Sequence, residues 1–337
     1  MPERLVVFTE REEGPVPGLD EELIRQNGGA IRYGRAADER DRVRLAAGAE
    51  VIVAGSTPLA RELFAALPRL KGVVRLGIGV DSVDLEAATE LGIVVANVPD
   101  FCSEEVAEHA LGLILAVTRK IALADRKTRQ GEWLPGMDAL MRPIRRLSGQ
   151  TLGLIGLGKI GQSLAAKAKG LGLSVMAHDP HVGAEAARAA GVPLMSLEEL
   201  LPQTDILSLH VPVTAETKGI VNARTLALLK PGAILINTAR GPVVEEAALQ
   251  AALASGRLAG AGLDVLQQEP PRLPHPLAEF ENVVFTCHYA SLSEQSYARM
   301  RQQVSEQTVQ ILRGEFPRHL VNLRVKDLPQ CRLRKDH

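Results

Sequence analysis

Short apolar runs rich in β-branched residues alternate along this chain with longer segments in which apolar residues recur every three or four positions. Runs of the first kind predict buried strands, whereas segments of the second kind predict amphipathic helices. This alternation from one end of the sequence to the other favours parallel sheets covered by helices over a sandwich of sheets or a bundle of helices. We therefore expect an α/β protein.

The predicted strands form two groups, separated by a basic loop with glycine and proline at residues 131–149. In the first group, strands are predicted at residues 5–8, 51–54, 73–76 and 94–96, with helices between them at 61–66 and 84–91. The second group has six strands, a number that suits one dinucleotide-binding domain. They are predicted at residues 152–155, 174–177, 205–209, 233–236, 261–263 and 283–286.

A long helix is predicted to begin at Ser103, in "SEEVAEHALGLILAVTRKIALADRKTRQGEW". Glu104 and Glu105 suit a first helical turn because carboxylates stabilise the positive end of the helix dipole. The apolar residues that follow repeat at helical spacing and form one stripe, as in a helix that bridges two domains or two subunits. A further helical stretch is predicted after Ser291.

Composition and charge exclude several classes of partner. The 337 residues exceed one ordinary domain, and 46% of them are hydrophobic, which is enough to fill two cores. The 39 basic and 40 acidic residues are interspersed, so we expect no binding to nucleic acid or to a membrane surface. No apolar run is long enough for a signal peptide or for the ~20 residues of a membrane span. We expect a cytoplasmic protein with a small-molecule partner.

The cysteines, Cys102, Cys287 and Cys331, do not have the short paired spacing of a metal site or of a disulfide framework. We predict free thiols, as in a reducing compartment, and no metal.

Three glycines in "TLGLIGLGKIGQSLAAKAKGLG" have the spacing GxGxxG: Gly156, Gly158 and Gly161. Taken alone, this spacing is common wherever a tight turn joins a strand to a helix. Here a buried strand precedes the glycines and a helix, residues 160–171, is predicted to follow them. In that position Gly156 permits the turn, Gly158 lets the backbone approach a pyrophosphate, and Gly161 lets the helix pack close to the sheet.

An acidic residue follows at the position that such a motif requires. Asp179 lies 18 residues past Gly161, directly after the predicted strand "SVMAH". A carboxylate there binds the 2′-hydroxyl of the adenosine ribose and repels a 2′-phosphate, which favours NAD over NADP. The alternative is that Asp179 is an ordinary turn residue before Pro180. We expect the flanking His178 and His181 at the surface.

Three polar residues follow the ends of later strands, where α/β enzymes bind their ligands: Arg240, Glu269 and His288. Arginine forms paired hydrogen bonds to a carboxylate or carbonyl. Histidine exchanges a proton near neutral pH, and a glutamate beside it would raise its pKa. Each also has a structural alternative. Arg240 would then be a turn residue, Glu269 a charged loop residue and His288 a core residue at a strand end.

Together, "GLGKIG", Asp179, "INTARG", "GLDVLQQEPP" and "TCHYAS" resemble the D-isomer-specific 2-hydroxyacid dehydrogenases. The separations of 29 residues from Arg240 to Glu269 and of 19 from Glu269 to His288 match the triad of that family. The resemblance extends from about Val51 to Asn322. Within the family, "NVPDFCSEEVAEHALGLILA" and "HYASLSEQSYARMR" are most similar to the branch of C-terminal-binding proteins and phosphoglycerate dehydrogenases.

The resemblance implies an NAD-dependent enzyme that transfers hydride between nicotinamide and C2 of a 2-hydroxy or 2-oxo acid. Arg240 would bind the substrate, and His288, paired with Glu269, would be the acid and base. The backbone N–H groups of Ile78 and Gly79 would bind the substrate carboxylate. The implied cofactor-binding residues are Gly156, Gly158, Lys159, Ile160, Gly161, Asp179, Val211, Pro212, Thr238, Ala239 and Asp264.

The resemblance also implies a fold of two doubly wound parallel-sheet domains. A Rossmann NAD-binding domain, residues 103–291, would be inserted into a flavodoxin-like substrate domain made of residues 1–102 and 292–337. The helix that begins near Ser103 would contribute to the interface of a homodimer.

The sequence departs from the family pattern around the histidine. Cys287 replaces the usual proline, and Tyr289 stands where small or branched residues are common, so the identity of the acid stays open. We expect no regulatory domain after Asn322. The resemblance leaves two alternatives from other classes, an NAD(H)-sensing corepressor-like module that binds protein partners and a plain NAD-binding structural protein.

Overall fold

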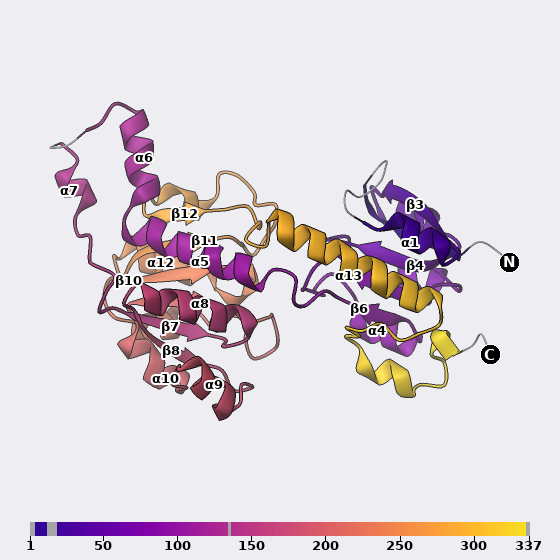
Figure 1. The fold of residues 1–337 in the computed structure, drawn as a ribbon. Helices are drawn as coiled ribbons and strands as arrows, with labels where there is room; N and C mark the ends of the chain where they lie inside the picture. Colours follow the sequence, from indigo (N-terminus) through magenta and orange to yellow (C-terminus); the bar gives the residue numbers. More distant parts are fainter. Residues whose placement is uncertain (1–3, 12–18, 134–135, 335–337) are drawn as a thin grey trace. The chain divides into compact units, whose positions relative to one another are not determined.

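The computed structural model describes residues 4–11, 19–133 and 136–334. The chain divides into two compact units, one made of Met1–Phe101 with Ser293–His337 and the other of Cys102–Leu292. Each unit contains one six-stranded sheet with helices packed against it (Figure 1). The predicted α/β class is confirmed.

The sheet of the first unit is parallel except at one edge, where β2 runs antiparallel to β3. In order across the sheet the strands are β2 (Glu10–Arg11), β3 (Gly29–Arg35), β1 (Arg4–Phe8), β4 (Ala49–Ala54), β5 (Gly72–Arg75) and β6 (Val94–Ala96). Its helices are α1 (Glu21–Gln26), α2 (Glu39–Leu45), α3 (Arg61–Ala66), α4 (Leu85–Glu90) and α13 (Glu294–Leu312), followed by the 3₁₀ turns Leu323–Asp327 and Arg332–Arg334.

All four strands predicted for this unit form, and so do the helix after Ser291 and the helix at residues 61–66. The prediction missed β2 and β3. The sequence of β3, "GAIRYGR", contains no continuous apolar run because the strand lies next to the sheet edge and is mostly half-exposed. Partial exposure near the edge removes the continuous apolar run by which buried strands are recognised.

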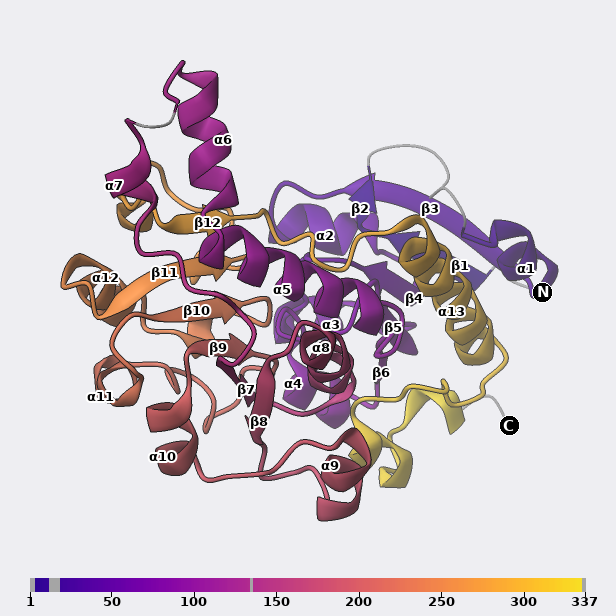
Figure 2. The ribbon, with the colours of Figure 1, turned by 60° about the vertical axis from the view of Figure 1, so that its left-hand side comes forward.

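The sheet of the second unit is parallel throughout, and its six strands match the six predicted ones (Figure 2). Across the sheet they are β12 (Val283–Phe285), β11 (Leu258–Leu263), β10 (Ala233–Asn237), β9 (Ile206–Leu209), β7 (Thr151–Ile155) and β8 (Ser174–His178). The main helices are α5 (Ser103–Thr118), α6 (Ile121–Arg129), α7 (Asp138–Met141), α8 (Lys159–Gly170), α9 (Ala184–Ala190), α10 (Leu197–Leu200), α11 (Ala223–Leu228) and α12 (Glu246–Ala254).

The order of these strands reverses between β7 and β9. The chain runs outward from β7 through β8 to a parallel bridge between Ala177 and Leu194, and then returns to β9 on the other side of β7. Ligands of open α/β sheets bind at the carboxyl ends of the strands beside such a reversal. The turn after β7, which contains the three glycines, lies there.

The helix predicted from Ser103 does begin there, but its expected continuation to Arg126 was wrong. The helix ends at Thr118 and a second one, α6, begins at Ile121, because Lys120 adopts a left-handed conformation with φ of 54°. The hydroxyl of Thr118 donates to the carbonyl of Ile114 within α5, and the Lys120 ammonium donates to the carbonyl of Leu140 in α7. The break is stabilised by a tertiary contact that helical spacing does not reveal.

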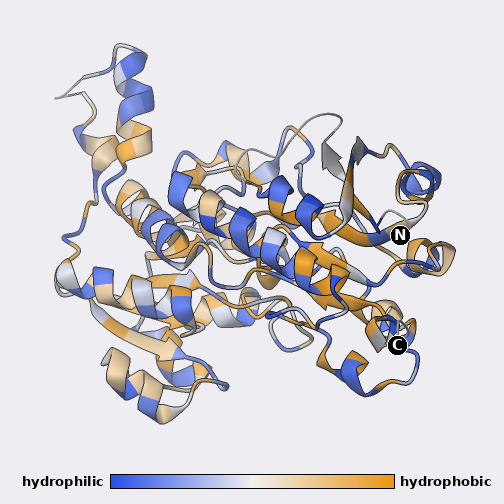
Figure 3. Ribbon diagram, turned by 45° about the vertical axis from the view of Figure 1, so that its right-hand side comes forward, coloured by the Kyte–Doolittle hydropathy of each residue, from blue (hydrophilic) through white to orange (hydrophobic). Residues whose placement is uncertain are grey.

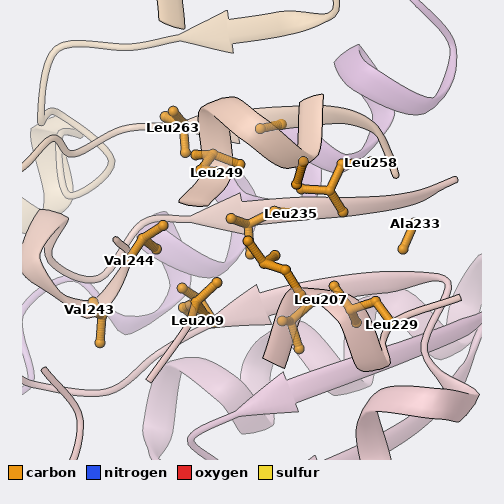
Figure 4. Close-up of a cluster of buried hydrophobic side chains, with 14 of the residues drawn as sticks. Leu207, Leu209, Leu229, Ala233, Leu235, Val243, Val244, Leu249, Leu258 and Leu263 are labelled. Atoms are coloured by element: carbon orange, nitrogen blue, oxygen red, sulfur yellow. The ribbon is translucent and has the colours of Figure 1, made fainter. Parts of the chain in front are cut away.

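Both faces of the second sheet are buried. Alternate residues of its strands face opposite sides and belong to two different apolar clusters. Leu207, Leu209 and Leu235 belong to one apolar cluster, whose side chains Figure 4 shows between β9, β10 and the neighbouring helices. Ile206 and Ile234 belong to the cluster under α5 and α8. In Figure 3 the strands are accordingly hydrophobic, whereas the helices carry both hydrophobic and hydrophilic residues. In the described part of the chain, no helix combines the length and apolar character needed to cross a bilayer.

Candidate active site

The glycine turn after β7 has the tight geometry that its sequence predicts. Gly156 has a φ of 97°, and a Cβ there would lie 2.5 Å from the carbonyl oxygen of His210. A Cβ on Gly161 would lie 2.4 Å from the carbonyl oxygen of Gly156, so the start of α8 packs closely against the turn. Gly158 is exposed, and among the described residues no atom lies within 4 Å of a Cβ built on it. This backbone is therefore open to the approach of a pyrophosphate.

Asp179 connects the end of β8 to the glycine turn. One of its carboxylate oxygens accepts the N–H of Leu157 at 2.8 Å, and the other accepts the N–H groups of His181 and Val182. His181 is exposed as predicted, but His178 is half-buried and its Nδ1 lies 3.0 Å from the carbonyl oxygen of Met195. The carboxylate thus lies beside the glycine turn and is hydrogen-bonded to it. Its contact with the ribose of a bound cofactor stays a prediction.

The other predicted cofactor residues lie at the carboxyl ends of the strands of the same sheet. Lys159 and Ile160 begin α8, Val211 and Pro212 follow β9, Thr238 and Ala239 follow β10, and Asp264 follows β11. The hydroxyl of Thr238 is buried and has no hydrogen-bond partner among the described residues. Buried hydroxyls are nearly always bonded, so this one is available to a bound ligand. The glycine turn, the Asp179 carboxylate and this hydroxyl together fit a nicotinamide dinucleotide.

Arg240, Glu269 and His288 lie after β10, β11 and β12, which are neighbouring strands. The Nδ1 atom of His288 lies 2.5 Å from Oε2 of Glu269, and Oε1 of Glu269 accepts the N–H of Leu266 at 2.9 Å. Glu269 therefore fixes the proton of the histidine ring on Nδ1. Proton exchange with a substrate is left to Nε2.

A glycine that the sequence analysis missed places the arginine next to this pair. A Cβ on Gly241 would lie 1.9 Å from the carbonyl oxygen of Leu266, so the loop after β10 touches the loop after β11. Arg240 immediately precedes this contact, and its Nη1 donates to the carbonyl of Ala239 at 2.7 Å. The signal in the sequence was the glycine of "NTARGP".

Electrostatics favour a protonated histidine beside an ionised glutamate. The hydrogen bond to Glu269 is the main cause that raises the pKa of His288, against burial and the charge of Arg240, which lower it. Partial burial acts to raise the pKa of Glu269. The hydrogen bonds from His288 and the N–H of Leu266, with the nearby cations, outweigh it and lower that pKa. The pair therefore stabilises the fold between these two pKa values, and its contribution is lost when acid protonates Glu269 or base deprotonates His288.

The remaining predicted substrate residues belong to the first unit. Ile78 and Gly79 follow β5, where the Asn97 amide donates to the carbonyl of Ile78 at 2.6 Å and Arg75 Nε donates to the carbonyl of Gly79 at 3.1 Å. These bonds occupy the carbonyl groups of both residues. Binding of an acid by their N–H groups stays a prediction.

Comparison with known proteins agrees with this geometry. Residues 111–290 match the family model of the D-isomer specific 2-hydroxyacid dehydrogenase, NAD binding domain. The chain is 40% identical over 268 residues to a glyoxylate reductase of Korarchaeum cryptofilum, which covers 80% of this chain and 81% of that protein. The chain belongs to the D-isomer-specific 2-hydroxyacid dehydrogenase family. It is an NAD-dependent oxidoreductase that interconverts 2-hydroxy and 2-oxo acids.

Two further members show the range of this family. A D-3-phosphoglycerate dehydrogenase of Methanocaldococcus jannaschii is 39% identical over 286 residues, which are 85% of this chain and 53% of that enzyme, so the chain spans about half of its length. The crystal structure of a D-lactate dehydrogenase from Aquifex aeolicus, complexed with NAD and lactic acid, superposes with a TM-score of 0.83 at 29% identity. The superposition covers 94% of this chain and 99% of the chain in that structure. These findings do not support the corepressor alternative.

Proposed function

We propose that this dehydrogenase acts on a small 2-oxo or 2-hydroxy acid, with His288 and Glu269 as the proton-transfer pair and Arg240 as the substrate ligand. The observation that carries the proposal is the 2.5 Å contact between His288 and Glu269. Arg240 is close enough for its charge to lower the pKa of both. An acid, the group that orients it and a cation for an anionic substrate thus lie together.

In the direction of reduction, protonated His288 donates the proton on Nε2 to the carbonyl oxygen of the 2-oxo acid. Glu269 keeps its hydrogen bond to Nδ1 and stabilises the imidazolium until the proton leaves. The guanidinium of Arg240 binds the substrate through charge-assisted hydrogen bonds and polarises its carbonyl. Bound NADH would supply the hydride that adds to C2 and would become NAD⁺. The product is the 2-hydroxy acid with neutral His288, and oxidation uses the same groups in reverse.

The two units would divide this work. The unit Cys102–Leu292 contains the proton-transfer pair and the glycine turn, and we assign NAD binding to it. We assign substrate binding to the unit of Met1–Phe101 and Ser293–His337, through the N–H groups of Ile78 and Gly79. Among the relatives, the glyoxylate reductase matches over four fifths of its own length, which favours a small unphosphorylated acid.

We further assign the chain to a cytoplasmic homodimer. Ile121 and Trp133 are large apolar residues with 54% and 74% of their surface exposed. Ile121 begins α6 and Trp133 follows the end of that helix, after the predicted interface helix, and large apolar residues left exposed favour burial against a second copy. Sedimentation velocity measures this state directly.

A panel of 2-oxo acids tests the proposed substrate class. With glyoxylate, hydroxypyruvate, a bulkier 2-oxo acid and a phosphorylated one, we expect oxidation of NADH to be fastest with a small unphosphorylated acid. NADPH should be used poorly, because the Asp179 carboxylate repels a 2′-phosphate. The measurement is the decrease of NADH or NADPH absorbance. Tight NADH binding without turnover of any acid would contradict the proposal.

The pH dependence of reduction tests the role of Glu269. Reduction needs protonated His288, so kcat/KM for the 2-oxo acid should fall as the pH rises through a pKa above 6.5. Glu269→Gln removes the negative charge that raises this pKa and should move the alkaline limb to lower pH. Profiles of kcat/KM in both directions, from about pH 5 to 9, locate the limb. Glu281→Gln, which removes an exposed carboxylate from the same unit, should leave the limb in place.

A further inference from the structure

The catalytic histidine belongs to a loop, residues 286–290, that is bonded along its length to one buried carboxylate. The side chain of Asp264 is 1% exposed. Its Oδ1 accepts the Thr286 hydroxyl at 2.6 Å and the N–H of Tyr289 at 3.1 Å, and its Oδ2 accepts the N–H of Ala290 at 3.0 Å. The backbone carbonyl of Asp264 also accepts the N–H of His288 at 2.8 Å. The orientation of this carboxylate therefore sets the path of the loop.

This loop needs such support because His288 has an unfavourable backbone conformation. Its φ is 55°, in the left-handed region that residues with a Cβ rarely adopt. A conformation of this kind persists only where surrounding contacts maintain it. The hydrogen bonds to Asp264 are contacts of that kind, on both sides of the histidine.

His109 of α5 contacts the threonine that bonds this carboxylate. Its Nε2 lies 2.9 Å from Oγ1 of Thr286. Because the single hydroxyl proton of Thr286 is donated to Asp264, this oxygen accepts the N–H of the His109 ring. The ring also meets Tyr289 edge to face, with centroids 5.0 Å apart. One side chain of α5 thus contacts the loop on both sides of the catalytic histidine.

Close packing of α5 on β11 determines where His109 lies. A Cβ on Gly260 would lie 2.8 Å from Val117, and a Cβ on Gly262 would lie 2.9 Å from Cβ of Leu113. Four residues along a helix and two along a strand each advance about 6 Å, so the next pair in this register is His109 and Asp264. The two glycines let the helix approach, and the register brings the imidazole to the end of the strand.

We propose that His109 and Thr286 are positioning residues for His288, which act by fixing the carboxylate of Asp264. Neither touches the substrate in this role. The proposal rests on the proposed function of His288. Arg240 lies on a different loop, after β10, so loss of the Thr286 hydroxyl should lower kcat while KM for the acid changes much less. Small displacements of a catalytic group lower rates strongly, and we expect a decrease of about 10- to 100-fold.

Thr286→Val is the decisive variant, because it keeps the shape of the side chain and removes the hydroxyl. Thr286→Ser restores the hydroxyl and should restore most of kcat. At His109, Gln retains an N–H donor and should be more active than Leu. The matched control is Thr118→Val on α5, where the lost hydroxyl donates within its own helix. For each variant kcat, KM, NADH affinity and the unfolding midpoint are measured, together with kcat of His288→Asn.

The outcomes separate this proposal from the function on which it rests. A low kcat in Thr286→Val, with recovery in Thr286→Ser and with NADH affinity retained, supports positioning. Wild-type kcat in Thr286→Val, while His288→Asn is inactive, overturns the positioning role alone. Equal losses in the Val and Ser variants, or in Thr118→Val, also overturn it, because the hydroxyl is then not the cause. Activity in His288→Asn overturns the proposed function. If Thr286→Val does not fold, equal kcat in His109→Gln and His109→Leu overturns the proposal.

Discussion

Replacement of His288 by Asn should lower turnover by about 10² to 10⁴-fold, the usual contribution of a general acid or base. Asparagine cannot donate the proton that the imidazolium supplies at Nε2. It does tolerate the left-handed backbone, so the φ of 55° at this position is kept. Alanine would add backbone strain to the chemical loss. The measurement is kcat for NADH oxidation with the best 2-oxo acid of the panel.

The affinity for NADH should be nearly unchanged in the same variant. The glycine turn and Asp179 follow β7 and β8, whereas His288 follows β12 at the opposite edge of the sheet. His181→Asn is the matched control, since it removes an exposed imidazole from the same unit. Turnover at the wild-type level in His288→Asn would remove His288 from the mechanism.

The two sheets were predictable because buried parallel strands appear as continuous apolar runs. The prediction of strands failed where the strand is partly exposed. Strand β3, next to an edge, has arginines and glycines in place of such a run. The break between α5 and α6 depends on Lys120, whose ammonium bonds a carbonyl 20 residues away. Local spacing contains no information about a contact of that kind.

The site was predictable where it depends on strand ends and not where it depends on packing between elements. Parallel strands end at one edge, so three polar residues after neighbouring strands had to lie close together. His109 is 177 residues from Thr286, and no spacing rule joins them. Residue 241 must be glycine because the carbonyl of Leu266, from another loop, leaves no space for a Cβ. Such partners become visible only once the loops are packed.

Replacement of Arg240 is the second variant with a large expected effect. Arg240→Lys keeps the charge but removes the planar fork, and hydrogen bonds to charged groups contribute about 1.5–3 kcal/mol each. Loss of one such bond should lower kcat/KM for the 2-oxo acid by about 10- to 100-fold. Arg240→Gln also removes the charge and should lower it further. Initial rates at varied acid and saturating NADH measure both effects.

The pH profile gives an independent test of where the arginine lies. The charge of Arg240 lowers the pKa of His288, so Arg240→Gln should raise that pKa and move the alkaline limb of reduction to higher pH. This shift is opposite to the one expected for Glu269→Gln, and Arg240→Lys should show much less of it. Arg224→Gln, the loss of an exposed arginine that pairs with Glu198, is the control for a general change in surface charge. If the limb moved equally in Arg240→Gln and Arg224→Gln, Arg240 would not act beside the histidine.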